Sequence, residues 1–509
     1  MKLNYKRTIL VGFAFFLISV FWMAYDAIIP LILTNHFGLP QSISGTVMSF
    51  DNILAVVLLP IFGALSDKVC TRIGKRTPFV IVGTICAVVF FVCLSLVDVY
   101  QLTQLTQNTD VVSNYKLAAE QLKEANEALK IAGKAGDQVA IDAARMMIAA
   151  AERSMEEVRV ETVNFTLSNA LPLVGFIGTL LLVLVSMATF RSPAVALMPD
   201  ITLKPLRSKG NAIINLMGTA GGILVFVLGM VFGTSGDKHM SYVWYVAAVC
   251  AIMVIGLIVF VTTVRERKWA EEMEAETKRL GIEEKAENAP ESGNKKLSRS
   301  EFISLLLILA SVALWYIGYN SITSKYSVYA TNVLFFDFNI TMIIAQAAAV
   351  VTYIPVGMIA SKIGRKKTIL AGIILLTTAF FIGNFINFDT PEFAMYPVFI
   401  LAGIGWATIN VNSFPMVVEL AKGGNVGKYT GYYYTASMAA QIVAPILSGV
   451  LYDLVGSFVG NANQGMRYVF FAFGTIFVAL SFVTMFFVKH GDSMPEKKKS
   501  ALESLDVDD

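Results

Sequence analysis

Two short stretches of the sequence decide the fold. GALSDKVCTRIGKR occupies residues 63–76, and GMIASKIGRKK occupies residues 357–367. Each stretch directly follows the second long apolar segment in its half of the chain, and each combines a glycine, a serine and a basic cluster. Two matched copies at equivalent places predict two structurally similar halves, repeated along the chain.

The composition indicates that most of the chain lies in a lipid bilayer. Of 509 residues, 56% are apolar and only 15% are charged, an excess that soluble proteins do not carry. A bilayer core about 30 Å thick needs roughly 20 helical residues to cross it. Twelve apolar stretches reach that length and predict twelve transmembrane helices: Thr8–Thr34, Ser44–Leu65, Thr77–Val97, Asn169–Leu197, Asn211–Gly233, Ser241–Val264, Phe302–Ser324, Phe338–Ala360, Thr368–Asn387, Phe393–Val418, Tyr429–Tyr452 and Tyr468–Val488.

The two repeated loops have the residue types of a gate. A glycine near a helix end permits close helix packing, and a carboxylate such as Asp67 can pair with a helix N-terminus or with a neighbouring arginine. We assign the gating role to the following residues: Gly63, Asp67, Arg72, Gly74, Lys75, Arg76, Asp200, Gly357, Gly364, Arg365 and Lys366.

Lysine and arginine concentrate in alternate short loops, whereas the intervening loops 35–41 and 389–392 contain neither. Short cytoplasmic loops are enriched in these two residues. We therefore expect both termini in the cytoplasm, and the protein in the plasma membrane or a bacterial inner membrane. The net charge of +3 then reflects orientation in the bilayer and not nucleic-acid binding.

Two polar insertions interrupt the spans. Residues 100–160 carry apolar side chains at helical spacing and a break at Gly133–Asp137, which predicts an extracellular helical hairpin. The pattern leaves open whether this hairpin is a passive decoration or binds a partner. Residues 265–299 mix acidic and basic side chains and predict a cytoplasmic helix and linker. The predicted organisation is N-bundle helices 1–3 in 1–99, the hairpin in 100–165, N-bundle helices 4–6 in 166–264, the linker in 265–300, C-bundle helices 7–12 in 301–489 and a cytoplasmic tail in 490–509.

The repeated loop is similar to the loop signature of the major facilitator superfamily. Within that superfamily, two stretches resemble the sucrose:proton symporters and the related glycoside-pentoside-hexuronide cation symporters. The residues that carry this resemblance are Pro60, Gly63, Ser66, Asp67, Thr71, Arg72, Gly74, Lys75, Arg76, Pro78 and Phe79, then Ser192, Pro193, Ala196, Leu197, Asp200, Arg207 and Asn211. The resemblance implies an all-α fold of two six-helix bundles and a cation-coupled sugar carrier.

The sequence also departs from these relatives. The sodium-coupled members carry two aspartates four residues apart on span two, where this chain has Ala55 and Leu59. The arginine of the sucrose transporters is replaced by Val195, although Arg191 lies one helical turn earlier.

Three formal charges lie inside the predicted spans: Asp26, Asp51 and Arg191. Charged residues within spans are rare and are functional candidates by default. The two aspartates lie at a similar depth on adjacent helices, about 12 Å below the outer surface. We assign cation coupling to them, because two close carboxylates cannot both ionise cheaply; for Asp26 the alternative is a polar residue that faces a hydrated outer vestibule. Arg191 is a substrate-binding candidate, with pairing to Asp67 or Asp200 as the alternative.

A sugar site needs aromatic rings and a few convergent polar groups in an otherwise apolar pocket. Several spans carry an aromatic residue and a polar residue on one face. The candidate substrate-binding residues are Trp22, Asp26, Arg191, Trp315, Tyr316, Tyr319, Asn320, Gln346, Trp406, Asn410, Asn412 and Gln441. Aromatic packing between helices is the alternative role for the rings, and a hydrogen bond between helices is the alternative role for Gln346, Asn412 and Gln441.

No complete phosphate-binding or dinucleotide-binding loop is present, so we expect no enzyme activity and no cofactor. The three histidines lie at span ends or in loops without a Cys or His cluster, so we expect neither a metal site nor a histidine proton relay. The sequence favours a monomeric proton-coupled symporter of a glycoside or oligosaccharide. A sodium-coupled symporter, a drug exporter of the same fold and a non-transporting receptor or scaffold remain alternatives.

Overall fold

The computed structural model describes residues 4–203, 206–279, 297–420 and 426–492. Parts of the expected linker (280–296) and tail (493–509) lie outside the described residues. The described residues contain no β-strand, and their regular structure is helical. The fold class predicted from the sequence, an all-α multi-pass membrane protein, is confirmed.

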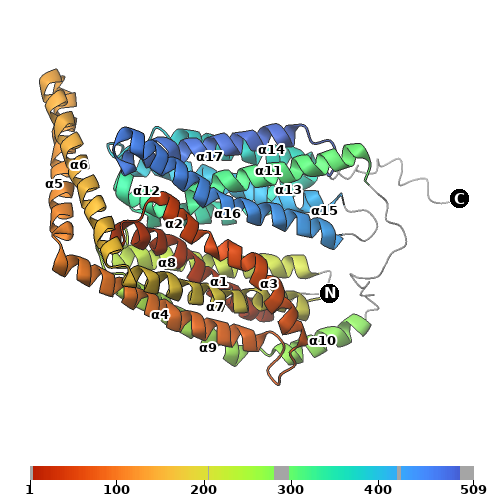
Figure 1. Ribbon diagram of the computed structural model, residues 1–509. Coiled ribbons are helices and arrows are strands. Elements are labelled where there is room, and N and C mark those ends of the chain that lie inside the picture. Colours follow the sequence, from red (N-terminus) through yellow and green to blue (C-terminus); the bar gives the residue numbers. More distant parts are fainter. Residues whose placement is uncertain (1–3, 204–205, 280–296, 421–425, 493–509) are drawn as a thin grey trace.

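The first half of the chain forms one group of helices (Figure 1). Its helices are α1 (Tyr5–Leu31), η1 (Ile32–His36), α2 (Gln41–Met48), α3 (Phe50–Lys68), α4 (Thr77–Asn108), α7 (Leu171–Ile201), α8 (Arg207–Phe232) and α9 (Val243–Thr263). Helix α4 packs on α7 and α9, and α1 packs on α8 and α9. A short helix, α10 (Glu266–Arg279), follows at the end that we call the linker end.

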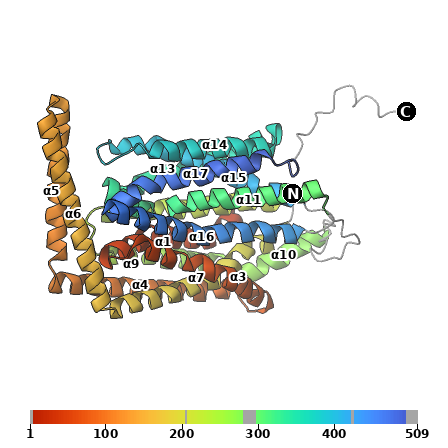
Figure 2. The ribbon, with the colours of Figure 1, turned by 45° about the horizontal axis from the view of Figure 1, so that its top comes forward.

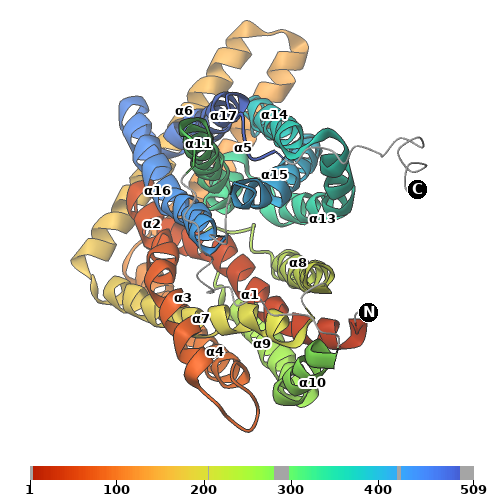
Figure 3. The ribbon, with the colours of Figure 1, turned by 90° about the vertical axis from the view of Figure 1, so that its right-hand side faces the viewer.

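The second half forms the other group, and Figure 3 shows the two groups side by side. Its helices are α11 (Arg299–Thr323), α12 (Tyr326–Tyr329), η3 (Ala330–Leu334), α13 (Phe338–Ile363), α14 (Arg365–Gly383), η4 (Glu392–Ala394), α15 (Met395–Val418), α16 (Val426–Val459) and α17 (Ala462–Phe486). Helix α11 packs on α16 and α17, and α15 packs on α13 and α14.

Eleven helices among the described residues are long and apolar enough to cross a membrane. Helix α13, with 26 residues and an apolar segment at Phe338–Tyr353, takes the place of the remaining expected span. The second expected span is broken at Ser49 into α2 and α3. The Ser49 hydroxyl donates to the carbonyl of Gly45 and to that of Ile442 in the other half, each at 2.9 Å, so the break lies against the second half.

Helices α5 (Val111–Ala135) and α6 (Gln138–Ser168) form a hairpin that projects beyond the bundle at the end opposite α10 (Figures 1 and 2). We call this the hairpin end. Gly136 adopts a left-handed backbone conformation at the turn (φ +71°), and the Asp137 carboxylate caps α6. A separate small core, including Leu105, Leu122 and Met155, holds the two helices together.

Candidate functional site

The three charged residues of the predicted spans meet in the first half of the chain. Asp26 on α1, Asp51 on α3 and Arg191 on α7 are partly buried and lie close enough for their charges to interact. The guanidinium carbon of Arg191 lies 5.3 Å from the ring centroid of Trp22. One Asp51 oxygen accepts bonds from the backbone and side-chain nitrogens of Asn52, at 2.6 and 2.7 Å. One cation thus stands beside two carboxylates.

The alternative pairing of Arg191 with Asp67 or Asp200 is not what the structure contains. Both carboxylates instead bind Arg76, with Nη2 to Asp67 at 2.5 Å and Nε to Asp200 at 2.9 Å. Arg191 lies instead against Trp22 of α1, and its charge acts on Asp26 and Asp51. We call these three charged residues and the aromatic residues beside them the central site.

The second half contributes an aromatic surface to the same region. Tyr319 on α11 stacks on Trp406 of α15 at a centroid distance of 5.8 Å, and Tyr353 of α13 meets Trp406 edge-on at 6.1 Å. Tyr319 is near enough to Asp26 for the carboxylate charge to act on its hydroxyl. The sequence missed Tyr353 because the other candidates were identified by an aromatic and a polar residue four positions apart, and the positions four residues from Tyr353 hold Ala349 and Gly357.

The other residues predicted to contact the substrate differ in where their side chains lie. Gln346 reaches across from α13 to the sulfur of Met23 on α1, at 3.4 Å, so it lies between the halves. Asn320 and Gln441 are partly buried and donate to carbonyls of their own helices. Tyr316 and Asn410 are partly buried as well.

Two of the predicted contacts do not face an open cavity. Trp315 is fully buried and packs on Tyr316 with a ring separation of 4.0 Å, so it is a core residue in this conformation. Asn412 is also buried, and its amide donates to the Thr408 carbonyl on the same helix at 2.9 Å. Trp315 was predicted from its four-residue spacing to Tyr319, and Asn412 as a polar residue in an apolar span, but both side chains are buried within the packed bundle.

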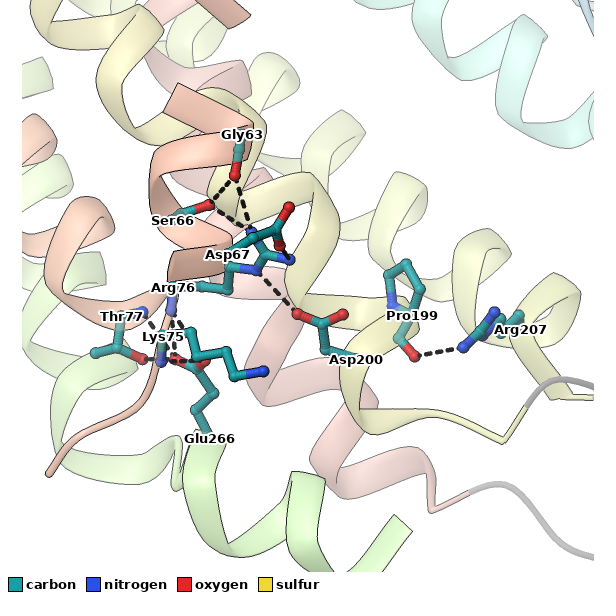
Figure 4. A network of polar contacts seen from close by, with 10 residues as sticks. All are labelled: Gly63, Ser66, Asp67, Lys75, Arg76, Thr77, Pro199, Asp200, Arg207 and Glu266. Atoms are coloured by element: carbon teal, nitrogen blue, oxygen red, sulfur yellow. Dashed lines mark hydrogen bonds and ion pairs between the residues drawn. The ribbon is translucent and has the colours of Figure 1, made fainter. Parts of the chain in front are cut away.

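The linker end of the first half is held by the network in Figure 4. Arg76 is buried and donates to the Ser66 hydroxyl and the Gly63 carbonyl in addition to its two carboxylates. Glu266 at the start of α10 accepts bonds from three consecutive backbone nitrogens, those of Lys75, Arg76 and Thr77, at 2.7 to 3.1 Å. A carboxylate therefore caps the N-terminus of α4, where the helix dipole favours negative charge. The sequence did not single out Glu266, because it lies among many charges in the linker.

The second half repeats this arrangement with different residues. Asp492, after α17, accepts bonds from the backbone nitrogens of Arg365 (2.7 Å) and Lys366 (3.2 Å) at the start of α14. Arg365 also pairs with Glu419, directly after α15, at 3.0 Å, as Arg76 pairs with Asp200 in the last turn of α7. The matched sequence loops thus correspond to matched networks.

Backbone conformation and close packing explain why each repeated loop has a glycine before its basic cluster. Gly74 (φ +131°) and Gly364 (φ +93°) have backbone conformations that favour glycine, and a Cβ at either position would collide with Glu266 or Asp492 respectively. Among the other gating candidates, Arg72 and Lys75 side chains are exposed, Gly63 packs on Ser192, and Gly357 has open space around it.

The expectation that the histidines have no histidine neighbour was wrong, whereas the expected absence of a metal site and of a histidine proton relay stays a prediction. His36 is fully buried, its Nδ1 lies 2.6 Å from an oxygen of Asp98, and its ring stacks on His239 at 6.3 Å. The sequence missed this cluster because α4 continues past Val97, the end of its apolar stretch, and carries Asp98 inside the protein. Histidines distant in the sequence also become neighbours only after folding.

The contacts between the two halves gather at the hairpin end. Asp453 of α16 accepts bonds from the backbone nitrogens of Gln41 (2.9 Å) and Ser42 (2.7 Å) at the start of α2. Lys325, fully buried after α11, donates to the Ser44 hydroxyl at 2.6 Å. Burial lowers the pKa of Lys325 to about 7, and the nearby charge of Asp453 opposes this shift. Asn332 donates to Asn35 across the same junction at 2.8 Å.

Comparison with solved structures gives the same architecture. The chain aligns with the xylose transporter XylE from E. coli in its inward-open conformation (TM-score 0.61, 13% identity, 99% of each chain). It also aligns with a D-xylose-proton symporter (TM-score 0.55, 14% identity, 96% of this chain and 99% of that one). A POT family transporter in complex with 5-aminolevulinic acid gives a TM-score of 0.59 at 9% identity, over 94% of this chain and 96% of that one. At these identities the likeness shows the fold alone.

Sequence comparison identifies the family. The MFS-type transporter ppzB of Metarhizium rileyi (strain RCEF 4871) is 28% identical over 109 residues, which are 21% of this chain and only 22% of that protein. The family described as MFS/sugar transport protein matches residues 10–104, and the family described as Major Facilitator Superfamily matches residues 163–421 and 335–505. Because the latter matches extend over more than half of the chain, this membrane protein belongs to the major facilitator superfamily.

Proposed function

We propose that this chain is a secondary active transporter that imports a glycoside or oligosaccharide, of the sucrose or maltose type, together with protons. The observation that carries this proposal is the meeting of Asp26, Asp51 and Arg191 in one half with Tyr319 of the other. A site between two similar bundles is accessible from either side in turn when the bundles rock, which is alternating access.

The aromatic surface suits a sugar. The faces of Trp22, Tyr319 and Trp406 can stack on the apolar faces of sugar rings, while carboxylates, the guanidinium and amides bind hydroxyls. The similarity to the MFS/sugar transport family and to xylose carriers supports this class of solute.

The balance of one guanidinium against two carboxylates supports a proton as the coupled ion. Arg191 balances one of the two carboxylates, and the second is left in a poorly hydrated interior where ionisation is costly. This second carboxylate takes up and releases a proton during the cycle, and the pair titrates as a coupled unit. The loss of the sodium-binding pattern at Ala55 and Leu59 favours protons over sodium.

The proposal includes an orientation. Basic short loops at the linker end put that end and both termini in the cytoplasm, and the hairpin outside the cell membrane. The chain acts as a monomer without a cofactor and performs no covalent chemistry.

The test is a counterflow screen of disaccharides at two pH values in proteoliposomes containing the purified protein. Sugar-specific exchange, accumulation driven by an inward proton gradient and persistence in sodium-free buffer are expected. Exchange that requires sodium would favour the sodium symporter, and efflux of amphipathic drugs without any response to sugars would favour an exporter. Absence of any solute movement, in protein that is folded by its thermal unfolding profile, would favour a receptor or scaffold.

A further inference from the structure

The hairpin is inserted in the first half of the chain, but the middle of α6 contacts the second half. We call the part of the hairpin between these contacts and α4 the hairpin base. The Gln464 amide donates to a carboxylate oxygen of Glu152 at 2.5 Å, and the Asn461 amide donates to the Glu152 carbonyl at 3.3 Å. The backbone nitrogen of Ala462 donates to Glu156 at 3.3 Å. We call these contacts between α6 and the start of α17 the clasp.

Both sides of the clasp are held in place by their own half. Asn461 caps α17 by accepting a bond from the Gln464 nitrogen at 3.0 Å. On the hairpin, Arg159 pairs with Glu156 at 2.5 Å. Burial raises the pKa of Glu152, and the bond from Gln464 opposes that shift. Ordered donors and acceptors make a specific contact at a low cost in side-chain entropy.

The hairpin moves with the first half. Its small core includes Leu105 of α4, and Gln101 of α4 donates to the Thr166 hydroxyl of α6 at 3.2 Å. At the other side of the hairpin base, Lys116 pairs with Asp237 of the α8–α9 loop at 3.3 Å. The hairpin is therefore a rigid arm of the first half that reaches over the second.

The chemistry of the clasp suits repeated opening. A small cavity beside it has a mixed lining from both sides, with polar residues such as Glu152, Asn463 and Arg467 next to apolar ones such as Leu122 and Phe335. Water can replace the hydrogen-bond partners of the clasp when the two surfaces separate. The net cost in free energy of opening is therefore modest. An apolar seal of the same area would hold the halves together more permanently.

We propose that the hairpin base is an interaction surface for the start of α17. Through this contact it stabilises the arrangement in which the two halves are joined at the hairpin end during transport. Asn332, which bonds Asn35 of the first half, lines the cavity beside the clasp, and the contact of Lys325 with Ser44 also joins the halves at the hairpin end. Opening of the central site toward the hairpin end separates the halves and breaks all of them. The clasp therefore lengthens the time for which the site faces the linker end. This inference rests on the alternating access proposed above, but not on the identity of the solute or of the coupled ion.

The test measures opening of the hairpin end with a single reactive cysteine. Gln41 is buried where α2 meets Asp453, so a Gln41→Cys side chain reacts with a maleimide only when the halves part. The background is the full chain with Cys70, Cys86, Cys93 and Cys250 replaced by serine, in nanodiscs that leave both ends accessible. The clasp variant is Glu152→Ala with Gln464→Ala. The matched control is Glu157→Ala, an exposed carboxylate on the same helix.

We expect the clasp variant to label about five- to tenfold faster than the background, which is the change that loss of one or two hydrogen bonds gives. The control should label at the background rate, and all variants should share the thermal unfolding midpoint of the background protein within a few degrees. Equal labelling of the clasp variant and the background would overturn the proposal, as would an equal rise in the control.

A second measurement separates failure of the clasp from failure of the proposed function. Linking Glu152→Cys to Gln464→Cys in the same serine background with a short dithiol-reactive reagent should stop sugar counterflow, and cleavage of the link should restore it. Full counterflow with the link in place would contradict the clasp. If the uncleaved and cleaved proteins both fail to move sugars, the labelling rates still decide the clasp, and the solute class proposed above is the part that is wrong.

Discussion

At the scale of single residues, the central site contains one guanidinium beside two carboxylates. This arrangement explains how two acidic side chains persist within transmembrane helices, since Arg191 offsets the charge of one. Trp22 lies under the Arg191 guanidinium and fixes its position by a cation–π contact. The remaining carboxylate is the group that the proposed mechanism uses.

The aromatic pair of the second half gives a residue-level prediction. Trp406→Ala removes the ring on which Tyr319 stacks and should raise the KM for the transported sugar about three- to tenfold, the usual value of one aromatic contact. Sugar uptake kinetics in proteoliposomes measure this. Trp244→Ala, at an exposed position of α9, is the control and should leave KM unchanged. An unaltered KM in Trp406→Ala would show that the Trp406 ring does not contact the sugar.

The sequence predicted the charged trio but not the other buried charges. Asp26, Asp51 and Arg191 stand alone within long apolar stretches, where any charge is conspicuous. Asp98 and Lys325 lie just beyond the ends of such stretches, where a charge is expected to meet water. Only the three-dimensional packing of His36 on Asp98, and of Lys325 on α2, shows that these two are buried.

At the scale of elements, each half has a carboxylate that closes the N-terminus of its third long helix. Glu266 does so for α4, and Asp492 does so for α14. The repeated sequence loops predicted equivalent positions in the two halves. They could not predict the capping carboxylates, because each comes from a segment far along the chain and only the fold brings it to the loop.

Removal of the Glu266 carboxylate should destabilise the first half. Glu266→Ala leaves three backbone nitrogens at the start of α4 without their acceptor, which should cost about 2–4 kcal/mol and lower the thermal unfolding midpoint by several degrees. Thermal unfolding of the purified protein measures this. Glu271→Ala removes an exposed partner of Arg267 on the same helix and should have little effect. Equal midpoints for the two variants would contradict the capping role.

The helices themselves were largely predictable, because a bilayer imposes a length of about 20 apolar residues on each span. The expected helix boundaries were wrong where a helix packs against other parts of the protein and not against lipid. The break at Ser49 is stabilised by a carbonyl of the other half, and α4 runs on to Asn108 to support the hairpin. Neither feature leaves a signal in the apolar pattern.

At the scale of the whole molecule, the structure has its two halves joined at the hairpin end. Lys325 is part of that junction and gives a pH-dependent prediction. Its pKa falls from an ordinary 10.5 to about 7 through burial, so protonation disfavours the closed arrangement. The closed hairpin end should therefore be most stable above pH 10.5 and lose stability as the pH falls toward about 7.

The Gln41→Cys labelling rate provides the measurement. Two Gln41→Cys proteins are compared, one with the native Lys325 and one with Lys325→Gln. The labelling rate of the first divided by that of the second, at the same pH, should rise as the pH falls from about 9 to about 7. The ratio removes the pH dependence of the maleimide reaction itself. The facing groups are the Ser44 hydroxyl, the Gln41 carbonyl and Asp453, and the charge of Asp453 is retained in both proteins. A ratio that stays constant over this range would show that Lys325 does not control closure.

Proton coupling through Asp26 and Asp51 is the central claim, and sugar-driven proton movement tests it most directly. Proteoliposomes that contain a pH-sensitive dye are given an inward sugar gradient without sodium. The native protein should acidify the interior, whereas Asp26→Asn and Asp51→Asn should exchange sugar without moving protons, and Asp142→Asn on the exposed hairpin should behave as the native protein. Acidification at the native rate in both site variants would contradict the account.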